Sequence, residues 1–173
     1  MDFSRGKEKY VYNNKCREVY VMKLLIESAS NIILLNETFP DSFDRRLFYR
    51  VIVSDESGRV FSTQRRKGKP TPKWNEEIEI HFNSYPIGQN LKLMIVCENY
   101  YNDPGTSTGQ VVKGRATIPI PINLGKVKVQ KVDLVKLVGV EKKVDATISF
   151  KTLLTTRLIY YFCINSDFYF HLD

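Results

Sequence analysis

Short apolar segments that alternate with polar residues are the dominant pattern of the chain. Met22, Leu24 and Ile26 lie two residues apart, as on one face of a β-strand. β-Branched and aromatic side chains are frequent in such segments, and these residue types favour strands. The pattern predicts an all-β fold, an eight-stranded antiparallel β-sandwich without an amphipathic helix. The predicted strands are 22–32, 47–53, 60–64, 74–82, 91–95, 116–120, 127–138 and 144–153.

The ends of the chain differ in character from its middle. Residues 1–18 are polar and of mixed charge, and we expect a loosely ordered N-terminal arm before a sandwich domain at 19–154. Residues 155–173 form an apolar and aromatic tail without clear periodicity. Two explanations of the tail stay open. It is either an adhesive segment that packs on the sandwich or a membrane, or translated non-coding sequence, because Ile, Tyr, Phe and Asn have AT-rich codons.

Composition limits the cellular setting. The 173 residues suit one domain, and no run approaches the roughly 18–20 apolar residues of a membrane-spanning helix. The N-terminus has no apolar core like that of a secretory signal. Cys16, Cys97 and Cys163 are odd in number and widely spaced, so neither disulfides nor a zinc site are expected. These features favour a reducing, cytoplasmic compartment. The net charge of +7 attracts nucleic acid, anionic lipid or acidic protein.

Five elements, in the right order, resemble those of C2 domains over residues 20–152. Pro-Lys-Trp-Asn-Glu at 72–76 is similar to the Pro-x-Trp-Asn-Glu element that opens the fourth strand of the family. Gly-Arg-Ala-Thr-Ile-Pro-Ile at 114–120 resembles the Gly-x-Ala-x-Ile-Pro-Leu element of the sixth strand. The other elements are the alternating first strand ending in Ala29 and Ile32, Thr63 before the second loop, and Leu91, Leu93, Ile95 and Glu98 in the fifth strand.

Size and loop character resemble the small stand-alone C2 proteins of plants, including the copine-associated type. That resemblance implies a signalling adaptor in stress or defence, peripherally associated with membranes. A membrane-associated protein such as a copine is the implied partner.

In the C2 arrangement, the loops after the first, third and fifth strands gather at one end of the sandwich. Calcium-binding members place several carboxylates there, because Ca²⁺ needs six to eight oxygen ligands. Here Arg45 and Arg46 follow the first acidic pair, where the family often has Asp-Pro-Tyr. A weak calcium site and no functional site both remain open, and no cofactor is required. The candidate ligands are Asp41, Asp44, Glu98 and Asp103.

The second of these loops is basic, with the cationic residues Arg65, Arg66, Lys67, Lys69 and Lys73. Near an anionic membrane each such charge contributes about 1 kcal/mol. Aromatic residues of the flanking loops suit the bilayer interface: Phe39, Phe43, Tyr100 and Tyr101. Together they predict docking to anionic phospholipids, independent of calcium in the simplest form. The alternatives are that the basic loop is an ordinary solvated turn, and that Phe39 and Phe43 only close the sandwich.

Other function classes have less support. His81 and His171 are the only histidines, and neither lies in a catalytic motif, so no enzyme is expected. No recognition helix or aromatic stacking sheet is predicted, so no nucleic-acid partner is expected. The serious rival is a protein–protein interaction module. Lys126, Lys128, Lys131 and Lys136 on the late strands suit either role.

Overall fold

The fold is seen in a computed structural model, which describes residues 13–32, 47–67, 71–98 and 110–163. In these ranges the chain forms strands and no helix, so the predicted all-β, antiparallel class is confirmed. The strands are β1 (Asn13–Ser30), β2 (Phe48–Ser54), β3 (Val60–Ser62), β4 (Arg66–Lys67), β5 (Lys73–Phe82), β6 (Asn90–Glu98), β7 (Val111–Pro119), β8 (Lys128–Val138) and β9 (Glu141–Cys163).

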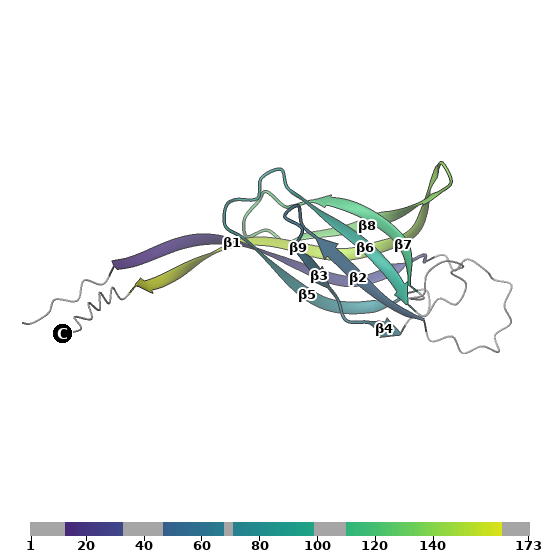
Figure 1. The fold of residues 1–173 in the computed structure, drawn as a ribbon, viewed down its shortest axis with the longest axis horizontal. Helices are drawn as coiled ribbons and strands as arrows, with labels where there is room; N and C mark the ends of the chain where they lie inside the picture. The colour runs from purple at the N-terminus through teal and green to yellow at the C-terminus, as the bar shows by residue number, and fades with distance from the viewer. Residues whose placement is uncertain (1–12, 33–46, 68–70, 99–109, 164–173) are drawn as a thin grey trace, which may run out of the picture.

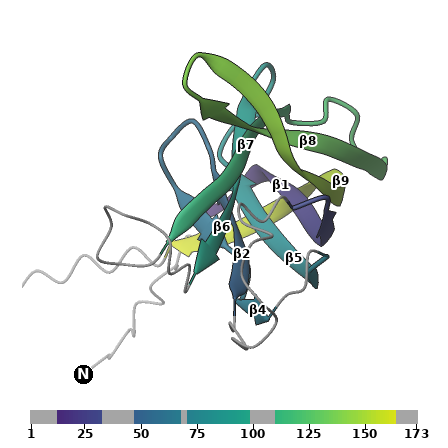
Figure 2. The ribbon, with the colours of Figure 1, turned by 90° about the vertical axis from the view of Figure 1, so that its right-hand side faces the viewer.

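The strands follow one hydrogen-bonded path, β3-β2-β6-β7-β8-β9-β1-β5, with β4 paired to β2. Figures 1 and 2 show this path folded over itself, so that β3-β2-β6-β7 face β8-β9-β1-β5. The two halves are joined by β7 and β8, which pair only through Arg115 and Val135. The arrangement is a sandwich that is nearly a barrel.

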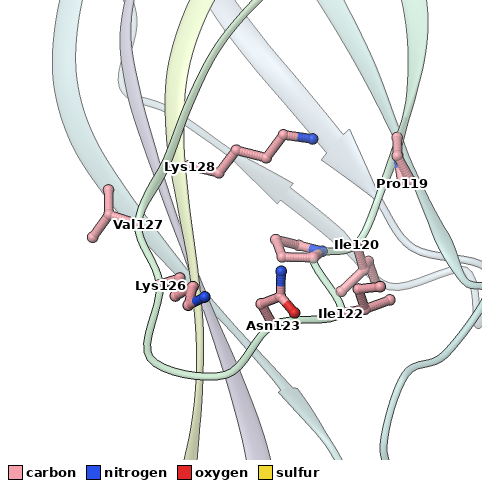
Figure 3. A pocket seen from close by; sticks show the side chains of 8 residues that line it. Pro119, Ile120, Ile122, Asn123, Lys126, Val127 and Lys128 are labelled. Atoms are coloured by element: carbon pink, nitrogen blue, oxygen red, sulfur yellow. The ribbon is translucent and has the colours of Figure 1, made fainter.

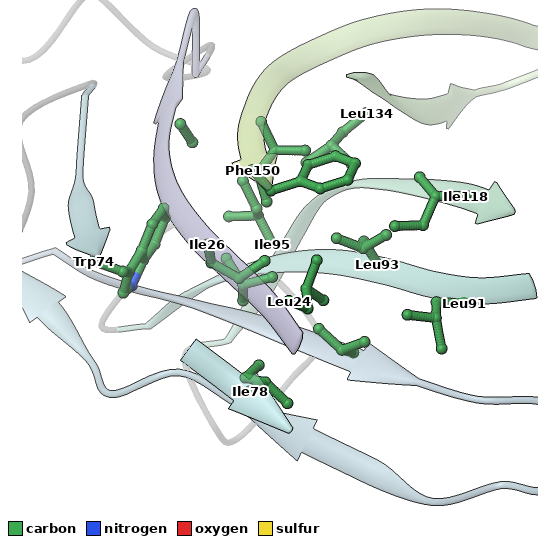
Figure 4. Packing of buried hydrophobic residues seen from close by; sticks show 14 of the residues in the cluster. Leu24, Ile26, Trp74, Ile78, Leu91, Leu93, Ile95, Ile118, Leu134 and Phe150 are labelled. Carbon is green, nitrogen blue, oxygen red and sulfur yellow. The ribbon is translucent and has the colours of Figure 1, made fainter. Parts of the chain in front are cut away.

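The core lies between the two halves and follows the predicted alternation. Leu24 and Ile26 of β1, Leu93 of β6 and Phe150 of β9 are almost wholly inaccessible to solvent (Figure 4). Trp74, at the start of β5, is also buried, and its indole Nε1 donates a hydrogen bond to the carbonyl oxygen of Tyr49 (3.3 Å). A buried indole N–H needs such an acceptor, so this bond ties β5 to β2 across the core.

The outer strands are longer than predicted. β1 begins at Asn13 and β9 continues to Cys163, and the two pair without interruption from Asn13↔Cys163 to Ile26↔Phe150. The expectation of a loosely ordered arm is therefore wrong for residues 13–18, and residues 155–163 belong to a strand. Figure 1 shows these parts as a two-stranded ribbon that leaves the sandwich. Since backbone pairing alone holds the ribbon, it needs no regular alternation of side chains.

The ninth strand, β4, was not predicted. Arg66 and Lys67 pair with Tyr49 and Phe48 of β2, inside the segment expected to be a loop. Main-chain pairing of two residues leaves no recognisable periodicity, so eight strands were expected where the described part of the chain has nine.

Gly114 marks the place where the two halves meet. A Cβ atom on this residue would lie 2.8 Å from Cβ of Leu134 on β8, and 3.0 Å from the carbonyl carbon and oxygen of Leu134. Only glycine allows the β7 backbone to come so near a neighbouring strand. Leu134 is itself fully buried, so it cannot move outward without opening the core.

We therefore expect Gly114→Ala to lower the free energy of unfolding by about 1–3 kcal/mol, as overpacking of a core does. Urea denaturation followed by circular dichroism measures this change. Thr117→Ala, at an exposed position of the same strand, is the matched control and should stay within about 0.5 kcal/mol of the wild type. Equal stability of the two variants would contradict the close approach.

Candidate functional site

One end of the sandwich collects the segments in which the candidate residues lie. The strands β1, β4, β6 and β8 end there, and β2, β5, β7 and β9 begin there, as their pairing requires. Figure 1 shows this loop end opposite the ribbon formed by the start of β1 and the end of β9. Several candidates lie outside the described residues: Phe39, Phe43, Asp41, Asp44, Lys69, Tyr100, Tyr101 and Asp103.

The basic cluster is partly paired with carboxylates of the same chain. Nη1 of Arg65 lies 3.0 Å from Oε2 of Glu98, and Nη2 of Arg66 lies 3.0 Å from Oε1 of Glu76. Lys67 and Lys73 are exposed, and neither forms an ion pair within the described ranges. Of the four cations that the structure describes, two are therefore held in place and two face solvent.

Glu98 is central to the loop end. Its carboxylate is buried, with Oε1 3.0 Å from Nε of Arg50 and Oε2 3.0 Å from Nη1 of Arg65. The Arg50 contact is an ion pair that lacks the geometry of a hydrogen bond. Two guanidinium groups thus share one carboxylate, which leaves a net positive charge. A calcium ion bound by Glu98 would have to displace or approach both cations.

Within the described ranges, no three side chains of the His, Cys, Asp or Glu type are grouped to hold a metal ion. Glu98 is the one predicted ligand that those ranges include. The other three proposed ligands stay predictions.

Glu76 organises the second loop from the β5 side. Its Oε2 accepts a hydrogen bond from the backbone N–H of Gln64 (2.7 Å), while Oε1 accepts one from Arg66 (3.0 Å). Next to it, the hydroxyl of buried Thr63 accepts a hydrogen bond from the backbone N–H of Val51 (2.9 Å). The main chain that leads into the basic segment is therefore anchored on both sides.

Two buried ionisable residues were missed by the sequence analysis. Lys113 is the extra residue of a β-bulge opposite Ile95 and Val96, and Asp145 is the extra residue of a bulge opposite Leu134 and Val135. A bulge turns a residue to the other face of its strand, which the sequence pattern does not reveal. Burial lowers the pKa of Lys113 and raises the pKa of Asp145, although each charge partly offsets the shift of the other.

Two hollows lie on β7 and its neighbours. The first, of about 370 Å³, lies near the loop end, and Arg115, Lys136 and Lys142 are among its lining residues. The second, of about 460 Å³, lies at the opposite end, along the connection from β7 to β8 (Figure 3). Ile120, Ile122, Lys126 and Lys128 line this second hollow.

The part of the chain that the structure describes includes no helix with the length and apolar character needed to cross a membrane.

Comparison with known proteins identifies the fold. No protein-family model matches the sequence, and no curated protein matches it. Among solved structures, a C2 domain of plant Extended Synaptotagmin 1 (its domain A) is 15% identical, with a TM-score of 0.56 over 80% of this chain and 96% of that one. A structure described as a C2 domain is 15% identical, with a TM-score of 0.51 over 78% and 97%.

Human GIVD cytosolic phospholipase A2 is also similar, with 14% identity and a TM-score of 0.58 over 82% of this chain. The chain spans only 17% of that protein's length. At such low identities the similarity shows the fold alone, and the fold is that of C2 domains.

The arrangement around Glu98 generates a test of stability. We expect Glu98→Gln, which keeps the size but removes the charge, to lower the free energy of unfolding by about 1–3 kcal/mol, because half-buried Arg50 then loses its counter-charge. Chemical denaturation measures this change. Glu77→Gln, which breaks the more exposed ion pair with Lys23, should have little effect. A harmless Glu98→Gln would show that the carboxylate is not needed to hold the arginines.

Proposed function

We propose that the protein is a peripheral membrane-binding C2 module that docks to anionic phospholipids through its basic loop. The observation that carries the proposal is the exposure of Lys67 and Lys73 at the loop end, without an ion pair in the described residues. Lys69 lies between them in the sequence, and the flanking aromatics Phe39, Phe43, Tyr100 and Tyr101 are proposed to enter the interface.

The paired arginines also contribute to this proposal. The side chains of Arg65 and Arg66 remain 67% and 44% exposed despite their ion pairs. A guanidinium group has five N–H donors, so one carboxylate contact leaves others for a phosphate group. We infer that Glu98 and Glu76 orient the two arginines and so reduce the entropy that membrane binding would otherwise remove.

The proposed binding has little calcium dependence. Glu98 already faces two guanidinium groups, so the first acidic position of the third loop is neutralised by the protein itself. Asp41, Asp44 and Asp103 remain the other candidates for a weak calcium site.

A second candidate function is a protein–protein interaction module. The observation in its favour is strand β8, which pairs with β7 only through Val135 and carries the exposed residues Val129 and Lys131. Such an open strand edge can pair with an extended segment of a partner. A copine as that partner, and a signalling role in stress or defence, are proposals that come from the resemblance to plant C2 proteins.

Vesicle co-sedimentation tests the lipid proposal. We expect binding to phosphatidylserine vesicles with chelator present, and weaker binding at 1 M than at 0.1 M salt, because the screening length falls from about 10 Å to about 3 Å. The double variant Lys67→Gln, Lys73→Gln should bind at least about tenfold more weakly at low salt, since each charge contributes about 1 kcal/mol.

The matched control is Lys126→Gln, Lys128→Gln, which removes the same charge at the opposite end of the sandwich. It should bind nearly as well as the wild type. Equal losses in the two double variants would show that net charge, rather than the loop, governs adsorption. No binding under any condition would favour the interaction module.

A further inference from the structure

A second cationic feature lies near the loop end, outside the three loops discussed so far. Arg115 of β7, Lys136 of β8 and Lys142 of β9 line the hollow of about 370 Å³. Its other walls include the apolar side chains of Val112, Val135 and Leu137, and no carboxylate of the described residues lines it. The hollow therefore combines three cations with apolar walls.

The hollow exists because β7 and β8 separate beyond their single point of pairing. Arg115 and Val135 form that pair, and the close approach of Gly114 to Leu134 holds the strands together there. Toward the loop end, β8 pairs with β9 instead, through Lys136↔Lys143 and Leu137↔Lys142. The β8–β9 hairpin thus diverges from β7 and leaves a space between them.

The charges of the hollow are not neutralised by nearby carboxylates. Arg115, Lys136 and Lys142 form no ion pair among the residues described, whereas the acidic residue of the hairpin, Glu141, faces Lys143 (3.7 Å). The charge of Asp145 acts electrostatically on Lys136, but that carboxylate is buried and is also opposed by Lys113. An anion is the ligand that this site favours.

The hairpin beside the hollow ends in exposed apolar residues. Val140 is 99% exposed, Leu137 66%, Val138 50% and Val144 47%. Gly139 has a φ of 63° in the two-residue turn between Val138 and Glu141, as the first position of a type II′ turn requires. This tight turn projects Val140 outward on a paired hairpin, toward the same end of the sandwich as β4 (Figure 1).

We propose that the hollow binds the phosphate of an anionic lipid headgroup while the tip of the β8–β9 hairpin enters the bilayer. This inference rests on the proposed membrane function and adds a fourth contact, distinct from the basic loop. Lipid is the favoured ligand because apolar residues at the tip adjoin cations in the hollow, and stable membrane attachment needs both attractions. Phosphate oxygens accept hydrogen bonds from the guanidinium group of Arg115 and the ammonium groups of Lys136 and Lys142.

Insertion of the tip is tested by tryptophan fluorescence. Trp74 is buried and serves as a constant background, so a new indole at Val140 reports its own surroundings. We expect Val140→Trp to show a blue-shifted emission with anionic vesicles, and quenching by lipids brominated in the acyl chain. Ile87→Trp, at a 68% exposed site between β5 and β6 at the other end, should show neither effect.

The headgroup site is tested by Lys136→Gln, Lys142→Gln, while Arg115 stays in place because it lies at the junction of β7 and β8. We expect this double variant to bind vesicles containing phosphatidylinositol 4,5-bisphosphate at least about tenfold more weakly than the wild type. The control is again Lys126→Gln, Lys128→Gln, and thermal unfolding checks that all variants fold.

The outcomes separate this inference from the proposed function. Unchanged Val140→Trp emission on vesicles that still bind the protein would overturn insertion and leave the basic-loop proposal standing. Equal binding by the two lysine variants would overturn the headgroup site. Binding of soluble inositol 1,4,5-trisphosphate without any binding to vesicles would assign the hollow to free phosphates and overturn membrane docking, whereas failure of the wild type to bind any anionic vesicle would overturn both proposals.

Discussion

The close contact between Gly114 and Leu134 is the constraint on which the rest of the structure depends. It brings β7 onto β8 and so joins the two halves of the sandwich at one pair of residues, Arg115 and Val135. A side chain at position 114 would push the halves apart, because Leu134 is held in the core. The same contact defines where β7 and β8 begin to diverge, and hence where the cationic hollow opens.

The bulges on either side of this contact explain why charged groups enter the interior. Lys113 precedes Gly114 and Asp145 follows the start of β9, and each is the extra residue of a bulge. Burial makes either charge unfavourable alone, but each moderates the pKa shift of the other. The fold thus accepts two ionisable residues near its loop end as a consequence of joining its halves tightly.

The cations of the loop end fall into two groups with different physical roles. Arg50, Arg65 and Arg66 lie against carboxylates, which fixes the main chain around the loop end. Lys67, Lys73, Lys136 and Lys142 make no ion pair in the described ranges and leave their charge to the surroundings. A framework of paired arginines that carries unpaired lysines is suited to adsorption on an anionic surface, because the positive charge is already oriented before contact.

Local patterns in the sequence determined the class of fold and the approximate strands. Alternation such as that of Met22, Leu24 and Ile26 was sufficient, because burial of one face imposes a period of two on a strand. The basic loop was also visible, since Arg65, Arg66 and Lys67 are adjacent in the chain. Strand segments without a buried face were not visible: the ribbon of 13–18 with 158–163, and β4, are held by main-chain pairing alone.

Only the tertiary structure decided which charges are paired within the fold and which face solvent. The partners of Arg65 and Arg66 lie 33 and 10 residues away in the chain, and sequence alone does not pair them. The hollow gathers Arg115, Lys136 and Lys142 from three strands, and the bulges turn Lys113 and Asp145 inward against the alternation. The physical reason is common to all of these: a sequence pattern reports which face of its own strand is buried, whereas electrostatic partners are set by which strands the fold places side by side.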